Sequence, residues 1–334
     1  MFSIDPAARQ PLVSVIVPTY NRAGVLPYLF EALGRQLYPS ASMELIVVDN
    51  SSKDDTEAVV DRWRTALPFE LRFYRKENRG PAASRNYGAA RARGDILAFT
   101  DSDCIPDPCW LRNAAAAFSS RDVGIVCGPF VLRPREDSGL FDHQVLGVVS
   151  DTGLYPTANL VVRAEAFAAV HGFDEQFGLY PWGDLVAGED TDFAWRVKRT
   201  GRRAVFSSGV VVGHQFPQPS FRSLLLKPVV LQIFPRLLRT IPELRQTALW
   251  KRYFLSPMHL YYYLAVLGVA AAAATRSLLP LLALTPWFVA SGRVAAQAGQ
   301  WRRAVAWFLA IQYSVTLAAL VLMAGSLRYR RLVL

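Results

Sequence analysis

Four short runs of mostly apolar residues recur within the first 100 residues, and a stretch with helical spacing follows each of the first three. The runs cover residues 13–18, 44–49, 71–74 and 96–100. Apolar runs of this length are typical of strands that are buried on both faces. Strands that alternate with helices predict a mostly parallel sheet covered on both sides. The chain is therefore expected to begin with an α/β, Rossmann-like fold.

Polar residues follow three of the four runs, at the point where each strand is expected to end. They are Thr19-Tyr20-Asn21, Asp49-Asn50-Ser51 and Asp101-Ser102-Asp103. In parallel sheets, ligands bind outside the carboxyl ends of the strands. We therefore expect these polar residues to converge on one edge of the sheet and to form a binding site there.

Asp101 and Asp103 have the chemistry of a cation site. Two carboxylates two residues apart on a turn offer the oxygen ligands that hard divalent cations prefer. Such a cation neutralises the charge of a diphosphate leaving group. The alternative interpretation is an acidic turn that binds no metal.

Residues 104–220 are less regular. Strands are expected near residues 123–131, 159–162, 204–206 and 210–212, and a helix is expected over residues 190–200. The three cysteines have no framework spacing and no accompanying His cluster, which disfavours a disulfide scaffold and a structural zinc site. The N-terminal segment lacks the apolar run of a signal peptide, so we expect this part of the chain in a reducing cytoplasm.

The excess positive charge lies entirely in the last third of the chain. Residues 1–220 hold 23 Lys and Arg against 26 Asp and Glu, whereas residues 221–334 hold 14 against one. The basic part is also the apolar part, a combination that favours contact with anionic membrane lipids. A nucleic-acid-binding protein usually carries its basic residues on a polar surface, so we predict no nucleic-acid partner.

Residues 221–334 are predicted to form a membrane-associated module. Short amphipathic helices at the membrane surface are expected over residues 221–255, and two or three transmembrane helices over residues 257–327. Residues 304–327 carry no charged side chain and are long enough to cross about 30 Å of hydrocarbon. Basic residues flank this segment at both ends. If the segment crossed the membrane, one of these basic flanks would lie outside the cytoplasm, against the positive-inside tendency. A buried helical bundle in a soluble protein is the alternative interpretation.

A set of motifs in residues 12–216 resembles the family 2 glycosyltransferases of the GT-A fold. The N-terminal motifs are SVIVPTYNR at 14–22, VVDNSS at 47–52, NRG at 78–80, SRNYG at 84–88 and GDILAFTDSD at 94–103. The later ones are GFDE at 172–175, GEDTD at 188–192, Arg196 and His214. Because order and spacing match as well as single motifs, the resemblance predicts a GT-A domain over residues 1–220.

The resemblance also implies roles for individual residues. Those implied to contact the nucleotide-sugar donor are Thr19, Asn21, Asp49, Arg85, Asp101 and Ser102. It further implies a divalent metal, Mg²⁺ or Mn²⁺, with Asp101 and Asp103 as ligands and Asp103 in direct contact. His214 occupies the position of a further metal or diphosphate ligand, although a structural histidine after a strand is the alternative.

Glu189-Asp190 matches the acidic pair of the family, in which the aspartate acts as general base. An inverting transfer needs a carboxylate beside the acceptor hydroxyl, on the face opposite the departing diphosphate. The resemblance therefore implies that Asp190 is catalytic and that Glu189 assists or holds acceptor hydroxyls. Trp182 is placed to stack on an acceptor sugar. The alternative for Glu189 and Asp190 is that they only favour a helix N-terminus. The alternative for Trp182 is a tryptophan buried in the core.

These observations predict an inverting, metal-dependent transfer of one sugar to a hydroxyl of a lipid-linked or cell-surface glycan. The Gln-x-x-Arg-Trp signature of processive synthases does not follow Asp190, which favours a single addition. The enzyme is expected at the inner (plasma) membrane, with its catalytic domain in the cytoplasm. A polyprenyl-phosphate glycosyltransferase and an inactive GT-A-like membrane scaffold are the competing hypotheses.

Overall fold

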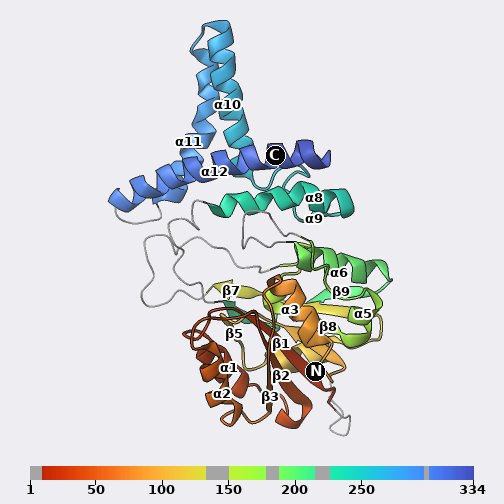
Figure 1. Cartoon of the computed structure of the whole chain (residues 1–334). Coiled ribbons are helices and arrows are strands. Elements are labelled where there is room, and N and C mark those ends of the chain that lie inside the picture. Colours follow the sequence, from red (N-terminus) through yellow and green to blue (C-terminus); the bar gives the residue numbers. More distant parts are fainter. Residues whose placement is uncertain (1–9, 133–149, 178–187, 215–225, 297–300) are drawn as a thin grey trace. The chain divides into compact units, whose positions relative to one another are not determined.

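The computed structural model describes residues 10–132, 150–177, 188–214, 226–296 and 301–334 (Figure 1). These residues form two compact units, one within residues 10–214 and one from residue 226 onward. The predicted boundary at residue 220 and the first five residues, 221–225, of the predicted surface-helix segment 221–255 lie outside the described residues. The boundary therefore stays a prediction.

The first unit is built on a seven-stranded sheet with the strand order β3-β2-β1-β4-β8-β6-β9. Its strands in chain order are β1 (Val13–Thr19), β2 (Met43–Asp49), β3 (Glu70–Arg75), β4 (Ile96–Phe99), β6 (Val123–Cys127), β8 (Leu160–Arg163) and β9 (Arg203–Phe206). Strands β3, β2, β1 and β4 are parallel, and only β8 runs antiparallel to its neighbours β4 and β6. The predicted mostly parallel sheet is confirmed.

Helices cover both faces of the sheet, as the continuous apolar runs require. The helices of this unit are α1 (Leu26–Gly34), α2 (Thr56–Arg64), α3 (Gly80–Ala89), α4 (Trp110–Ala117), α5 (Ala164–Ala169) and α6 (Glu189–Arg199). Short 3-10 turns are η1 (Ser40–Ser42) and η3 (Thr157–Asn159). Val13, Val15 and Val17 of β1 belong to the core that contains α1, α2 and α4. Ile16 points to the opposite face, where α3 packs so closely that a Cβ at Gly88 would lie 2.7 Å from its Cγ2.

A smaller sheet extends the edge where the strands end. It contains β5 (Cys104–Pro106), β10 (Val212–His214) and β7 (Phe130–Leu132) in the order β5-β10-β7. The antiparallel register of β10 and β5 pairs His214 with Cys104. This pairing brings two residues that are 110 positions apart in the sequence to the same place, directly after the Asp101-Ser102-Asp103 turn.

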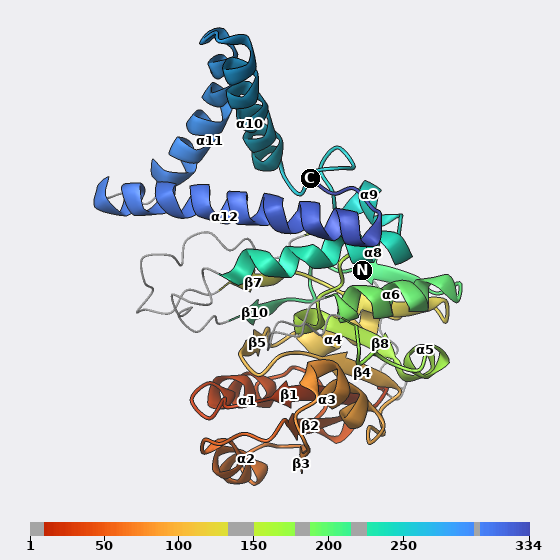
Figure 2. The ribbon, with the colours of Figure 1, turned by 45° about the horizontal axis from the view of Figure 1, so that its top comes forward.

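The second unit is helical. It comprises η4 (Lys227–Gln232), α8 (Ile233–Thr240), α9 (Leu244–Thr247), α10 (Pro257–Thr275), η5 (Leu279–Leu284), α11 (Thr285–Ala296) and α12 (Trp301–Tyr329). Helices α10 and α11 run side by side as a hairpin, and α12 runs across the foot of that hairpin (Figure 1 and Figure 2). Three segments, 257–275, 279–296 and 301–329, are long and apolar enough to cross a membrane.

Candidate active site

The ends of β1, β2 and β4 surround a pocket of about 370 Å³ in the first unit. Its walls are formed by Pro18, Thr19, Tyr20, Arg22, Asn50, Asn78, Gly80, Pro81, Arg85, Asp101, Ser102, Asp103 and His214. The volume lies within the range of about 300–1,000 Å³ that is usual for small-molecule sites. The pocket contains Thr19, Arg85, Asp101, Ser102, Asp103 and His214, so most of the predicted donor and metal residues are brought together.

Thr19 and Asn50 form the polar wall at the ends of β1 and β2. The Thr19 hydroxyl is buried and has no hydrogen-bond partner among the described residues. Asn50 is held in place by the Ser84 hydroxyl, which donates to its Oδ1 over 2.7 Å. Buried polar groups are nearly always hydrogen-bonded in folded proteins. The free Thr19 hydroxyl in the pocket wall therefore indicates a place where a bound ligand supplies the missing partner.

Asn21 and Asp49 lie beside the pocket rather than in its wall. Asn21 has a left-handed backbone (φ 52°), and its Oδ1 accepts the Lys53 N–H over 2.7 Å. The buried Asp49 carboxylate accepts the Ser52 N–H at 3.1 and 3.2 Å, accepts the Ser52 hydroxyl, and lies 3.6 Å from Arg75 Nε. Both side chains thus fix the turn that follows β2. The predicted contact of Asp49 with the nucleotide-sugar donor stays a prediction.

Arg85 connects the two acidic motifs. Its guanidinium is buried, lies 2.8 Å from Asp101 Oδ1 and lies 3.1 Å from Glu189 Oε1. Burial acts to lower the pKa of Arg85, but the carboxylates of Asp101 and Glu189 outweigh it, so the pKa is raised and the group stays charged. The sequence analysis assigned Arg85 to the nucleotide. The structure also places it between the strand end at Asp101 and the start of α6.

Asp103 lies between a cation and an imidazole. Its carboxylate is 3.7 Å from Arg22 Nη2 and 3.5 Å from His214 Nε2. Burial raises the pKa of Asp103, and the His214 ring partly opposes that rise. Arg22 was not singled out by the sequence analysis. Its position three residues after the end of β1, next to the predicted polar residues, is the signal that identifies it.

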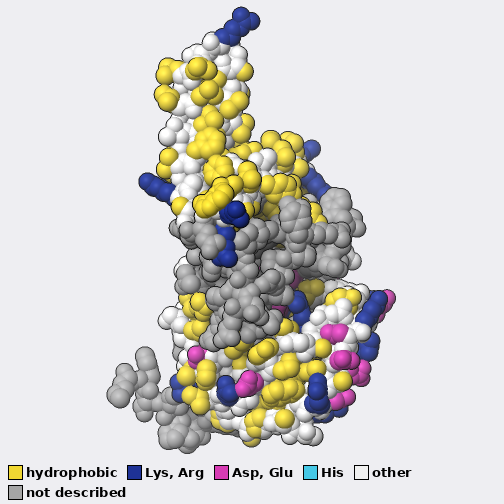
Figure 3. All heavy atoms as spheres, turned by 90° about the vertical axis from the view of Figure 1, so that its left-hand side faces the viewer, with side chains coloured by type: hydrophobic (Ala, Val, Ile, Leu, Met, Phe, Trp, Pro, Cys, Tyr) yellow, Lys and Arg dark blue, Asp and Glu magenta, His cyan; other side chains and the backbone are white. Residues whose placement is uncertain are grey.

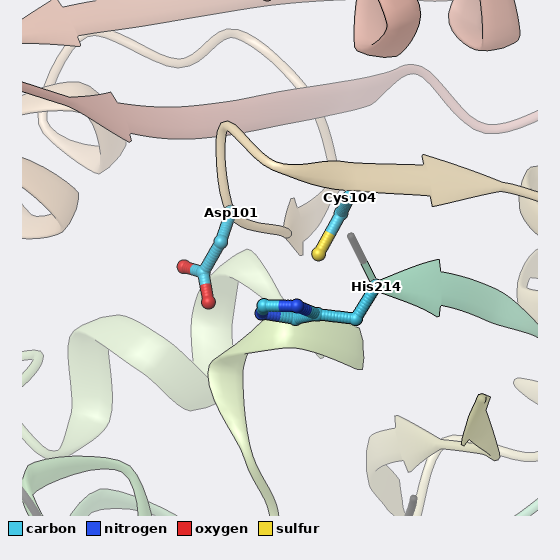
Figure 4. Close-up of side chains that lie close together, drawn as sticks. All are labelled: Asp101, Cys104 and His214. Atoms are coloured by element: carbon cyan, nitrogen blue, oxygen red, sulfur yellow. The ribbon is translucent and has the colours of Figure 1, made fainter. Parts of the chain in front are cut away.

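A mixed group of ligand atoms lies at the same edge. Oxygen, sulfur and nitrogen atoms of Asp101, Cys104 and His214 lie within 4.8 Å of one another, and their side chains converge in Figure 4. Cys104 was not among the predicted site residues, although it directly follows Asp103. Burial, with added repulsion from Asp101 and Asp103, raises the pKa of the Cys104 thiol well above its usual value. Together with Asp103, this donor set has the carboxylate and imidazole groups that fit a divalent cation.

Asp190 lies in the first turn of α6 and has the electrostatics of a proton acceptor. Burial and the neighbouring Glu189 raise the pKa of Asp190 to about 7. The Thr191 N–H, which donates to Asp190 Oδ1 over 2.7 Å, and the charge of Arg85 limit that rise. Trp182, the predicted acceptor platform, lies outside the described residues. Neither Glu189 nor Asp190 lines the pocket of Asp103; Arg85 joins the two regions.

A Rossmann-like sheet that ends in a D-x-D turn, joined by an arginine to an E-D helix start, defines a glycosyltransferase of the GT-A fold. The sequence comparison identifies the family. The glycosyl transferase family 2 model matches residues 14–169, and the glycosyl transferase family group 2 model matches residues 96–325. The chain belongs to the family 2 glycosyltransferases, and the hypothesis of an inactive scaffold is set aside.

Named relatives share the family over most of the first unit. The glycosyltransferase AglE of Haloferax volcanii is 31% identical over 225 residues, which are 65% of this chain and 70% of AglE. The pre-mycofactocin glycosyltransferase of Mycobacterium tuberculosis is 28% identical over 215 residues, 60% of this chain and 42% of that protein.

Solved structures show the same fold. The mannosyltransferase PcManGT from Pyrobaculum calidifontis, in complex with GDP-Man and Mn²⁺, matches with a TM-score of 0.66 at 25% identity. The match covers 94% of this chain and 87% of PcManGT. Residues 1–349 of Staphylococcus aureus TarS with UDP-GlcNAc match with a TM-score of 0.52 at 19% identity, covering 96% of this chain and 92% of that one. The likeness to TarS concerns the fold alone.

Proposed function

We propose that this glycosyltransferase moves one sugar from a nucleotide-sugar donor to an acceptor hydroxyl with inversion, assisted by a divalent metal. The observation that carries the proposal is the position of Arg85, which contacts both Asp101 of the D-x-D turn and Glu189 of the E-D helix start. Transfer requires that the donor and the proton acceptor be held close to each other, and Arg85 contacts the neighbouring residues of both regions. The GDP-Man and Mn²⁺ bound to PcManGT support a nucleotide sugar as the donor.

Asp190 would accept the proton of the attacking hydroxyl. A general base works best when its pKa lies near the working pH, and the pKa of Asp190 is raised to about 7. Glu189 stays paired with Arg85 and holds that guanidinium toward Asp101. A polyprenyl-phosphate acceptor attacks with a phosphate oxygen that needs little help from a base. A base at Asp190 therefore belongs to the hypothesis of a hydroxyl acceptor, whereas a phosphate acceptor does not require it.

Asp101, Asp103 and His214 would hold Mg²⁺ or Mn²⁺ at the donor. The metal supplies positive charge that stabilises the diphosphate as it leaves. Arg22 and Arg85 line the same pocket and add two further cationic side chains. The Thr19 hydroxyl, which lacks a partner among the described residues, would donate to the donor nucleotide. The pocket is thus suited to a ligand that is anionic at one end and polar at the other.

The acceptor is proposed to be a lipid-linked or cell-surface glycan. Three helices of the second unit are apolar and long enough to cross a membrane, which supports an enzyme that works at a bilayer. Lipid-linked acceptors present their sugars at that surface. The location that fits best is the inner membrane, with the first unit in the cytoplasm.

The donor can be identified by thermal-shift screening of the full-length protein in detergent against UDP, GDP, TDP and CMP sugars with Mn²⁺. A ligand that binds only the folded protein raises its apparent melting temperature. The Asp103→Ala variant is the control, because it should lose the Mn²⁺-dependent part of the shift. NMR of the product with the identified donor then gives the anomeric configuration. A product that keeps the donor's configuration would overturn the inverting mechanism.

A further inference from the structure

Apolar surface is concentrated on the hairpin of α10 and α11. Gly268 permits the close approach of its two arms, since a Cβ there would lie 2.6 Å from the Pro280 carbonyl oxygen. Tyr262 and Trp287 pack edge to face across the hairpin with ring centroids 5.4 Å apart. In Figure 3, hydrophobic side chains cover most of the visible face of this hairpin, with basic side chains at its tip and foot.

Charge is distributed unevenly along the hairpin. Arg276, which ends α10 at the tip, is the only charged residue between residues 253 and 292. The other basic residues of the second unit precede α10, lie in the last turn of α11, or flank α12. At a rise of about 1.5 Å per residue, the 19 residues of α10 extend for about 28 Å, close to the hydrocarbon thickness of a bilayer.

Both ends of α12 lie on the side of the unit where the hairpin begins. Only residues 297–300 separate α11 from α12, and at about 3.6 Å per residue this link is too short to cross about 30 Å of hydrocarbon. At the other end, the Leu334 N–H donates to the Tyr253 carbonyl over 2.8 Å, and the Leu255 N–H donates to the Leu334 carbonyl over 3.1 Å. Tyr253 and Leu255 directly precede α10.

The packing of α12 also indicates that its C-terminal end lies on the side where the hairpin begins. Its Gly325 lies against Pro235 and Gln232, so close that an added Cβ would be 3.1 Å from Pro235 Cγ. Pro235 and Gln232 belong to α8 and η4, which also precede the hairpin. If α10, α11 and α12 all crossed the bilayer, the end of α12 would be on the far side from these partners. Three crossings are therefore incompatible with the observed contacts.

The exposed face of α12 is suited to lipid. Its large exposed apolar side chains recur at helical spacing and form one stripe: Val305, Leu309, Tyr313, Leu320, Met323 and Leu327. Ala318, Ala319, Leu322 and Gly325 are buried on the other side. Basic residues at both ends, Arg302 and Arg303 at the start and Arg328 at the end, would then contact headgroups of the same leaflet.

We infer that α10 and α11 cross the membrane as a hairpin, and that α12 lies along the membrane surface on the side where the hairpin begins and ends. The inference rests on the membrane attachment in the proposed function. Among the described basic residues of the second unit, it places Arg276 on the far side and the others on the near side. That distribution satisfies the positive-inside tendency, which a three-span arrangement does not. The near side is therefore the cytoplasmic one.

Single-cysteine labelling of the full-length protein in sealed membrane vesicles tests the inference. Gln246→Cys, Ser277→Cys and Leu332→Cys introduce thiols at exposed positions before, at the tip of and after the hairpin. A membrane-impermeant maleimide should label positions 246 and 332 from the cytoplasmic face and position 277 only from the opposite face. The unsubstituted protein, whose three cysteines lie in the first unit, gives the background.

Two results would overturn the inference. Labelling of positions 332 and 277 from one face and of position 246 from the other would establish three crossings. Labelling of all three positions from one face would establish that nothing crosses. Transferase activity is measured in the same vesicles with added donor. Lost activity with the expected labelling would contradict the proposed function alone. Retained activity with a different labelling pattern would contradict the topology alone.

Discussion

At the scale of single residues, the buried Arg85 guanidinium is the group on which the site depends most. It neutralises the buried Glu189 carboxylate and also pairs with Asp101. Arg85→Met should therefore destabilise the protein by about 3–5 kcal/mol, because removing one partner leaves a buried charge uncompensated. Arg79→Met is the matched control. Arg79 is exposed and pairs with Glu77 at the surface, where a salt bridge contributes at most about 1 kcal/mol.

Denaturant unfolding of the two variants measures the difference. Equal destabilisation by Arg85→Met and Arg79→Met would contradict the view that Arg85 holds the two acidic motifs together.

Asp190→Asn should abolish most of the transfer reaction. General-base catalysis contributes about 10²–10⁴-fold to rates, so a loss of kcat of that size is expected. Binding of the nucleoside diphosphate with Mn²⁺ should stay nearly unchanged, because Asp190 does not line the donor pocket. Asp192→Asn is the control on the same helix turn, since Asp192 pairs with Arg196 at 2.7 Å. Full activity of the Asp190 variant would remove the base from the mechanism and favour a phosphate acceptor.

The raised pKa of Asp190 also predicts a pH dependence of activity and stability. Activity should rise with pH through about 7, as the carboxylate loses its proton. Stability should change in the opposite sense. The folded state binds this proton more tightly than the unfolded state, so the stability that the proton provides is present below about pH 4 and is lost as the pH rises through about 7.

Melting curves from pH 5 to about 8, compared between the protein and Asp190→Asn, check the sign. The variant should lose less stability than the parent over this range. An identical pH dependence of the two proteins would show that Asp190 titrates normally.

At the scale of elements, the contact between α3 and the sheet sets the position of Arg85. Gly88 of α3 lies over Ile16 and Val48, where an added Cβ would be 2.7 and 3.2 Å from their methyl groups. Both side chains are buried, so they have little freedom to move aside. Gly88→Ala should therefore destabilise the first unit by about 1–3 kcal/mol, the usual cost of overpacking.

Gly24→Ala is the control for that substitution, because an added Cβ at Gly24 would meet nothing within 4 Å among the described residues. Thermal unfolding followed by circular dichroism measures both variants. A stability loss in Gly24→Ala as large as that in Gly88→Ala would indicate a general effect of removing glycine and would contradict close packing of α3.

At the scale of the whole molecule, we propose that the acidic first unit catalyses the transfer and that the basic, apolar second unit attaches the enzyme to the membrane. The full-length protein should remain in the membrane fraction after washing with about 1 M salt, which screens charges beyond about 3 Å, and after alkaline carbonate. Burial of the apolar hairpin, rather than attraction to headgroups, would hold it there. Centrifugation and immunoblotting measure the retained fraction. Release by salt alone would establish a purely electrostatic surface attachment.

Much of this organisation could be predicted from the sequence. Strands β1 to β4 were placed within one residue at each end, because each is a mostly apolar run bounded by polar residues. Beyond residue 104 the predictions were less accurate. The predicted strand over 123–131 is two strands, β6 and β7, and the strand expected at 210–212 begins only at Val212. Short strands in a small sheet have too little local pattern to define their ends.

The sequence by itself determined the class of fold through its periodicity, and the family through the resemblance of its motifs. It also predicted two units, because charge and hydropathy differ between the two parts of the chain. Only the tertiary structure decided which side chains meet. Arg85 contacts Glu189 across 104 residues, and Cys104 pairs with His214 across 110. It also brought Leu334 beside Tyr253, the contact from which two crossings rather than three are inferred. Such contacts depend on strand register and on chain closure over long separations, and local sequence encodes neither.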